Sequence, residues 1–458
     1  MIRRLFTKDR CFYRDFFSMT FILALQNLIT CAVNLADNVM LGAYAETSLS
    51  GAAVVNQIQF ILQMLTMGIG EGMVVLGAQY WGKRELDPIR RIFSIGLKLG
   101  LLCGTLLWAI VFFFPVPVLS LFTNDQAVIA EAKDYLQIVC FSYFFFCITN
   151  TSICALRGVE TVRIGVVVSL VALLVNAGIN YLLIFGKFGA PELGIRGAAI
   201  GTLIARMVET VVVTIYLIFF DKKLRITFRT LLSFDWQLFR DYIRVGAFVI
   251  MSNLIWGIAM AVQSAILGHL DSAGSASSSV IAANSIATTI FQVLTVVTYG
   301  ASSAAAVLTG RTVGENNIPK VKEYARTMQV LFVIIGVATG LLLFLLKEPI
   351  LDLYALSDET RSLTSSFINV LCITVIGTSY QCPALTGIVR GGGDTRFVFF
   401  NDSIFMWGLV LPLSALAAFV FHWPALAVFW ILKSDQIAKC FVAFPKVNRF
   451  RWIRQLTR

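Results

Sequence analysis

The chain has 458 residues, of which 58% are hydrophobic and only 14% are charged, and its mean hydropathy is +0.80. An average soluble domain is about 25% charged, so this composition excludes an ordinary soluble protein and predicts a polytopic membrane protein. The net charge of +11 does not point to nucleic acid, because the basic residues lie between apolar runs and form no continuous basic face.

Twelve apolar segments follow one another along the chain, each long enough to cross a hydrocarbon core about 30 Å thick. They span residues 18–43, 51–78, 93–118, 134–155, 163–186, 195–220, 244–269, 279–308, 326–346, 364–388, 397–420 and 424–444. Lys and Arg gather at both ends of the chain and in every second connection, which predicts that both termini are cytoplasmic. The predicted fold class is therefore all-α, with twelve transmembrane helices.

The two halves of the sequence repeat. Leu76–Gly82 matches Leu308–Gly314 at an offset of 232 residues. The same offset pairs Pro117 with Pro349, Tyr135 with Phe367 and Cys140 with Cys372, and later Leu156-Arg-Gly158 faces Val389-Arg-Gly391 after a short insertion. Since six spans is an even number, the repeats are expected to form two six-helix lobes related by a pseudo-two-fold axis along the membrane normal. We predict an N-terminal lobe over 1–220, a cytoplasmic connector over 221–240 and a C-terminal lobe over 241–458.

The first span contains a carboxylate, Asp37, within the otherwise uncharged run Met19–Leu41. An unpaired charge at the bilayer centre costs about 2.5 to 3.5 kcal/mol on insertion scales, so such a residue is a candidate functional group. Asn176 and Asn180 are four residues apart in the fifth span and hence on one helix face, and Thr202 lies in the sixth. These oxygen-bearing side chains would suit either Na⁺ or a proton on a buried acid. A metal site for Na⁺ at Asp37, Asn176 and Asn180 is part of this hypothesis.

Structural alternatives exist for each of these groups. Asp37 could cap a broken helix, and the two Asn residues could simply join helices by hydrogen bonds. Arg206 and Glu209 are three residues apart and are interpreted as an intrahelical ion pair, with Arg206 as the main basic residue within the spans. When the halves are aligned at their Leu-Gly pairs, Asp37 faces Gln263.

Motifs of catalysis are not found. Gly391-Gly-Gly-Asp394-Thr395 lacks the Lys of a phosphate-binding loop and is interpreted as a cytoplasmic turn, with Asp394 or Thr395 capping the next span. There is no HExxH, GxSxG or paired carboxylate set, and the nine Cys contain no CxxC pair. Neither an enzyme nor a cofactor is expected.

An ordered set of short motifs resembles the multidrug and toxic compound extrusion (MATE) family over about residues 20–445. The motifs are Ala36–Gly42, Gln79–Gly82, Leu156–Gly158, Asn176–Gly186, Pro191–Ala199 and Val389–Thr395. The resemblance implies a monomeric secondary antiporter in the bacterial cytoplasmic membrane, which exports cationic or lipophilic organic compounds in exchange for inward H⁺ or Na⁺.

The resemblance also implies roles for single residues. Asp37 resembles the family's first-span coupling acid, and Asn176, Asn180 and Thr202 fall where related members hold cations. The family's acids of the seventh and tenth spans are not matched, since the seventh has none and the tenth offers Ser379, so coupling is expected in the N-terminal lobe alone. Candidate residues of the substrate cavity are Gln57, Gln263, Asn284 and Gln292. The alternatives are a lipid-linked precursor flippase of the same superfamily and a membrane scaffold or receptor that transports nothing.

Overall fold

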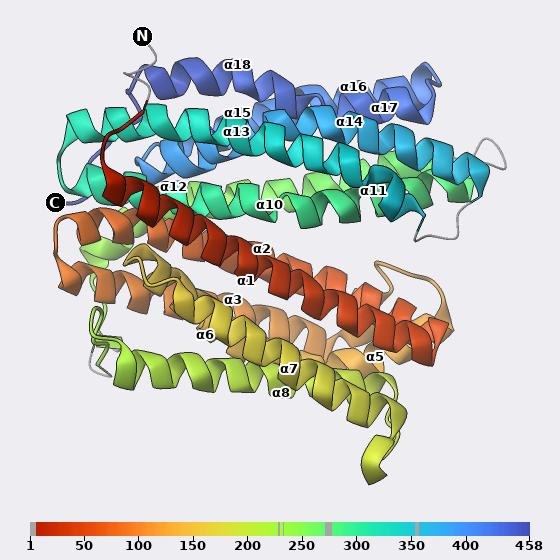
Figure 1. Ribbon diagram of the computed structural model, residues 1–458. Helices are drawn as coiled ribbons and strands as arrows, with labels where there is room; N and C mark the ends of the chain where they lie inside the picture. The colour runs from red at the N-terminus through yellow and green to blue at the C-terminus, as the bar shows by residue number, and fades with distance from the viewer. Residues whose placement is uncertain (1–5, 228–229, 232, 271–276, 353–356) are drawn as a thin grey trace. The chain divides into compact units, whose positions relative to one another are not determined.

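The computed structural model describes residues 6–227, 230–231, 233–270, 277–352 and 357–458, and within these ranges the regular structure is helical (Figure 1). The helices of the first half are α1 (Arg10–Tyr44), α2 (Glu46–Gly82), α3 (Leu86–Phe113), α4 (Pro115–Leu119), α5 (Gln126–Val139), α6 (Ser142–Gly158), α7 (Arg163–Phe185), η2 (Lys187–Gly189), α8 (Ile195–Ile215) and the π-helical turn η3 (Tyr216–Phe220). The predicted all-α polytopic fold is confirmed.

The second half begins with five helices of 18 to 34 residues and ends with a series of shorter ones. They are α10 (Trp236–His269), α11 (Ser277–Leu294), α12 (Val296–Gly314), α13 (Ile318–Leu351), α14 (Asp358–Cys382), η5 (Pro383–Val389), α15 (Thr395–Ser403), η6 (Ile404–Val410), α16 (Leu411–Ala415), η7 (Leu416–Val420), α17 (Ala425–Lys433) and α18 (Asp435–Asn448). Local signals place several boundaries: Asp125 and Asn317 accept hydrogen bonds from the first turns of α5 and α13, and α7 ends at Gly186 with φ of 63°.

Nine helices of the described chain are long and apolar enough to cross a membrane, and two bent pairs raise the number to eleven. The bent pairs are α5 with α6, at 56°, and α11 with α12, at 44°. The segment predicted as the twelfth span, 424–444, differs from the prediction because it is divided at Ser434 into α17 and α18. Lys433 lies just before this division and Asp435 and Lys439 lie after it, and these three charges lower the hydropathy of the segment.

The helices form two compact units, and the borders between these units fall inside two helices. One unit comprises Leu25–Asn253, and the other comprises Met1–Ala24 together with Leu254–Arg458. Both α1 and α10, the first helices of the two repeats, therefore begin in one unit and end in the other. Each unit has its own apolar core, which contains Leu62, Val139 and Ile184 in the first and Leu371, Phe429 and Leu432 in the second.

The start of α10 is fixed to the first unit by specific contacts. The hydroxyl of Tyr242 donates to the carbonyl of Ile69 at 2.8 Å, and the amide of Asn253 donates to the carboxylate of Glu71 in α2 at 3.1 Å. In the second unit, the backbone N–H of Thr7 donates to Thr327 in α13, and the ring of Phe12 at the start of α1 lies 4.4 Å from that of Tyr324. These contacts explain why the unit borders do not coincide with the ends of helices.

Candidate functional site

Asp37 lies inside α1, which is continuous from Arg10 to Tyr44. The alternative in which Asp37 caps a broken helix is therefore wrong. The first unit brings the Asp37 carboxylate into contact with α7, where the amide of Asn180 donates to Asp37 Oδ1 at 2.6 Å. This short contact to an ionised group is of the stronger, charge-assisted kind.

The four predicted site residues form one hydrogen-bonded chain across three helices. The Asn180 amide also donates to Asn176 Oδ1 at 3.2 Å, and the Asn176 amide lies 3.5 Å from Thr202 Oγ1 in α8. Asn176, Asn180 and Thr202 are 2%, 0% and 8% exposed, whereas Asp37 is half-buried. The carboxylate is therefore the open end of an otherwise buried polar chain.

One acceptor in this chain has no partner among the described residues. Asn180 Oδ1 is buried and accepts no hydrogen bond. An unsatisfied buried acceptor costs roughly 1 to 3 kcal/mol, so its retention needs an explanation such as an ion or water bound there. Asp37, Asn176, Asn180 and Thr202 together offer the oxygen atoms that hard cations prefer.

The space for Asn180 depends on the absence of a side chain at Gly201 in α8. A Cβ atom at Gly201 would collide with Asn180 Oδ1. We expect Gly201→Ala to displace the Asn180 amide and to cost about 1 to 3 kcal/mol of stability through overpacking. In transport assays this variant should lose ion-coupled efflux, whereas Gly178→Ala, at an α7 position where a Cβ meets nothing within 4 Å, should not. Equal activity of both variants would contradict the assigned position of Asn180.

Two residues near this site were not assigned to it by the sequence analysis. Tyr135 of α5 is buried, interacts with Thr202 and lies within electrostatic reach of Asp37. Arg206 of α8 also acts on Asp37 electrostatically. Its guanidinium pairs with Glu209 at 2.9 Å and lies over the ring of Phe146, so the predicted intrahelical ion pair is confirmed. Tyr135 could have been identified from the internal repeat, because the second half has an apolar Phe367 at the matching position.

A further acid, Glu71, lies in the span predicted over 51–78 but was not singled out. Its contact with Asn253, described above, places it where α10 packs on α2, apart from the polar chain of Asp37. An acid within a predicted span was itself the signal that could have identified it.

The predicted cavity residues do not come together in the same way. Gln57 and Gln292 are exposed on α2 and α11, and Asn284 is half-buried. Gln263 is 5% exposed and contacts Met406 Sδ at 3.3 Å and Lys433 Nζ at 3.4 Å. In the described part of the second unit no polar contact joins Gln263 to Asn284 or Gln292, so their common role stays a prediction.

Asp394 behaves differently from the prediction for the Gly-rich turn. It occupies the position before α15, but its side chain makes no capping hydrogen bond. The carboxylate instead pairs with Lys446 at 2.8 Å and with Arg454 at 3.3 Å, and it is 2% exposed. The capping prediction for Asp394 is wrong because two cations compete for the same carboxylate. Arg206 was predicted to be the main intramembrane cation, whereas the Lys439 side chain is also buried, at 6% exposed, inside the second unit.

The fold and this polar chain define a helical integral membrane protein with a half-buried ionisable group in one of its two units. The sequence matches the model of the MatE family over residues 23–182 and 248–416. The chain belongs to that family, which is the family of MATE multidrug efflux transporters.

Curated relatives and a solved structure agree with this assignment. The chain is 24% identical over 390 residues to the probable multidrug resistance protein NorM of Thermotoga maritima, an alignment that covers 85% of this chain and 82% of NorM. It is also 24% identical to the multidrug resistance protein MdtK of Yersinia pseudotuberculosis, with 96% of each chain covered. A crystal structure of a MATE in complex with MaL6 superposes with a TM-score of 0.85 at 17% identity and covers 96% of each chain, which shows the fold.

Proposed function

We propose that the chain is a secondary antiporter of the bacterial cytoplasmic membrane, with both termini in the cytoplasm. It exports cationic or lipophilic organic compounds in exchange for inward H⁺ or Na⁺ and works as a monomer. Family membership and the names of the NorM and MdtK relatives support the export of drugs. The observation that carries ion coupling is the contact of 2.6 Å between the Asn180 amide and the Asp37 carboxylate, next to an acceptor oxygen, Asn180 Oδ1, that no described residue contacts by a hydrogen bond.

The chemistry of the site suits a monovalent cation. Asp37 contributes one formal negative charge, and the other three side chains contribute neutral oxygen atoms. A single proton or Na⁺ would neutralise Asp37, and either would weaken the charge-assisted hydrogen bond from Asn180.

Because α1 is continuous, ion binding at Asp37 in the first unit can affect the part of α1 that belongs to the second unit. Asp37 lies in the first unit, while the segment Arg10–Ala24 of the same helix belongs to the second. A change in the hydrogen bond between α1 and α7 would therefore bias an element that both units share. Ion binding can shift a conformational equilibrium only if the ion binds the two states with different affinity, and loss of the Asn180 contact in one state would supply that difference.

The proposed exchange is tested in vesicles that contain the purified protein, with a lipophilic cation as the exported compound. We expect efflux to stop when the gradient of the coupling ion is collapsed and to continue when the other gradient is collapsed. Because no motif for nucleotide hydrolysis is present, added ATP should have no effect. Efflux that persists with both ion gradients collapsed would contradict secondary antiport.

A further inference from the structure

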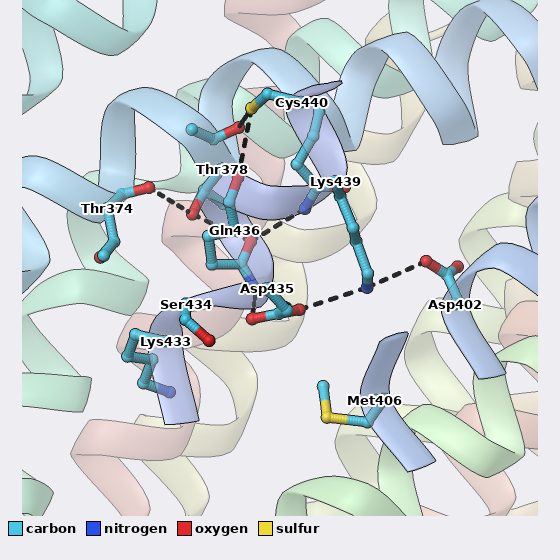
Figure 2. Close-up of polar contacts among 12 residues, drawn as sticks. Thr374, Thr378, Asp402, Met406, Lys433, Ser434, Asp435, Gln436, Lys439 and Cys440 are labelled. Carbon is cyan, nitrogen blue, oxygen red and sulfur yellow. Dashed lines mark hydrogen bonds and ion pairs between the residues drawn. The ribbon is translucent and has the colours of Figure 1, made fainter. Parts of the chain in front are cut away.

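The second unit contains a charged cluster that the proposed coupling site does not use. The Lys439 ammonium, on α18, lies 3.1 Å from Asp402 Oδ1 and 3.2 Å from Asp435 Oδ2 (Figure 2). Lys439 and Asp435 are buried, with 6% and 1% of their side chains exposed, but 30% of the Asp402 side chain is exposed. We call Asp402, Asp435 and Lys439 the charge triad.

The two carboxylates of the triad differ in how firmly they are held. Gln436 Nε2 lies 3.0 Å from each oxygen of Asp435. Gln436 Oε1 in turn accepts hydrogen bonds from Gln381 at 2.8 Å and from Thr378 at 3.1 Å, both on α14. Figure 2 shows Asp435, Gln436 and Thr378 on one side of the Lys439 ammonium and Asp402 on the other. Asp435 is thus fixed by a buried network, whereas within the described part of the chain the Asp402 carboxylate pairs only with the Lys439 ammonium.

The internal repeat relates this cluster to the coupling site of the first unit. The offset that carries Arg157 to Arg390 carries Arg206 to Lys439 and Thr202 to Asp435. Both units therefore place a cation on the sixth helix of the repeat. The position of the acid differs between the repeats. In the first repeat it is Asp37 on the first helix, where the second repeat has Gln263, and in the second repeat it is Asp435 on the sixth helix.

The charges of the triad do not balance. Two carboxylates share one ammonium, which leaves one negative charge. The nearby cation Lys433 acts electrostatically on Asp435, but no ion pair joins it to either carboxylate among the described residues. Its ammonium lies 3.4 Å from Gln263 Oε1 and 5.7 Å from the centre of the Phe429 ring. A charged side chain within a membrane span avoids lipid, and 30% of the Asp402 side chain is exposed, so water or a ligand can reach this carboxylate.

We propose that Asp402 binds the positively charged group of the exported organic cation, and that Lys439 is a resident ammonium which the substrate displaces. When the cation arrives, Lys439 stays with Asp435, which Gln436 holds in place, and Asp402 pairs with the substrate. The loaded site is then neutral, with two carboxylates and two cations. This inference takes its substrate class from the proposed function and adds the residue that recognises the charge.

The close packing of α18 keeps the triad rigid enough for such a competition. A Cβ at Gly377 in α14 would collide with the Gln436 carbonyl, and the Cys440 thiol donates to the Gly377 carbonyl at 3.5 Å. Gln436 and Lys439 are therefore held on a helix that cannot move away from α14 without losing these contacts. The ammonium can leave Asp402 by a change of side-chain rotamer alone.

Binding of tetraphenylphosphonium to the purified full-length protein tests this assignment without any ion gradient. We expect Asp402→Asn to weaken binding at least tenfold and Asp402→Glu, which keeps the charge, to stay within threefold of the unchanged protein. Neutral triphenylphosphine oxide should bind both variants equally. Asp352→Asn is the matched control, because Asp352 forms an exposed ion pair with Arg361 in the same unit. Its binding should change less than twofold.

The double variant Asp435→Asn/Lys439→Gln distinguishes competition by the Lys439 ammonium from a purely structural role of the charge triad. It keeps one negative charge at Asp402 and removes the competing ammonium, so we expect tetraphenylphosphonium to bind equally well or several-fold more tightly. The inference is overturned if Asp402→Asn binds like the unchanged protein, if Asp402→Glu loses as much as Asp402→Asn, or if the folded double variant loses affinity. This assay uses no ion gradient and varies no residue of the coupling site, so failure of the ion-coupling proposal, which is measured as efflux in vesicles, is distinguishable from failure of this inference.

Discussion

Asp37→Asn is expected to abolish concentrative efflux while leaving the protein folded. The substitution is isosteric, and the new side chain can still accept the hydrogen bond from Asn180, which now measures 2.6 Å. It removes only the charge that would bind and release the coupling ion. One charge that moves through ~150 mV provides about 3.5 kcal/mol, which sustains a substrate gradient of a few hundredfold. The gradient should therefore fall from that range to about one in vesicles that contain the variant.

The control for this substitution is Asn34→Ala. Asn34 lies about one turn before Asp37 on α1 and is exposed, so its loss should leave the gradient unchanged. If Asp37→Asn vesicles build the same gradient as the unchanged protein, Asp37 is not the coupling residue. Equal losses in both variants would indicate damage to α1 rather than to the ion site.

Asp394→Ala is expected to lower the stability of the second unit more than the loss of an exposed carboxylate would. The carboxylate is 2% exposed and pairs with Lys446 and Arg454, and the tail is further fixed by Arg454 N–H donating to the Gly392 carbonyl at 2.9 Å. Removing one partner of a buried ion pair costs about 3 to 5 kcal/mol because a charge is left uncompensated. Arg454 is half exposed and solvated, so the lower end of that range applies.

Thermal unfolding of the purified protein measures this effect. Asp352→Ala is the comparison, because it removes a carboxylate whose pair with Arg361 is exposed to solvent. An exposed pair contributes at most about 1 kcal/mol, so the melting temperature should fall much further for Asp394→Ala. Equal shifts in the two variants would show that the contacts of Asp394 with the C-terminal tail add nothing to stability.

Much of the fold could be predicted from the sequence because hydropathy and the internal repeat are strong signals. The long first span became α1 without a break, and the predicted segments 51–78 and 163–186 correspond to α2 and α7. Bends were not predictable: residues 134–155 read as one apolar run, yet the chain turns by 56° between α5 and α6. Hydropathy reports only which segments are apolar and not which helices pack together. It therefore could not show that α1 and α10 each belong partly to both units.

The candidate site was more predictable in the first unit than in the second. Asn176 and Asn180 share a helix face by their spacing, and a carboxylate in an apolar span is conspicuous, so the contact of Asn180 with Asp37 follows from simple rules. Lys439 and Asp435 were overlooked because the surrounding segment, 424–444, was interpreted only as a span. Extending the repeat register from Arg157 and Arg390 to the sixth span would have aligned Arg206 with Lys439.

The most direct test of ion coupling at Asp37 follows the coupling ion itself. An outward gradient of a lipophilic cation is imposed on vesicles that contain the protein, and the movement of H⁺ and of Na⁺ in the opposite direction is recorded. We expect the unchanged protein to move one of these ions and Asp37→Asn to move neither. Ion movement of equal size in Asp37→Asn vesicles would contradict the assignment of coupling to Asp37.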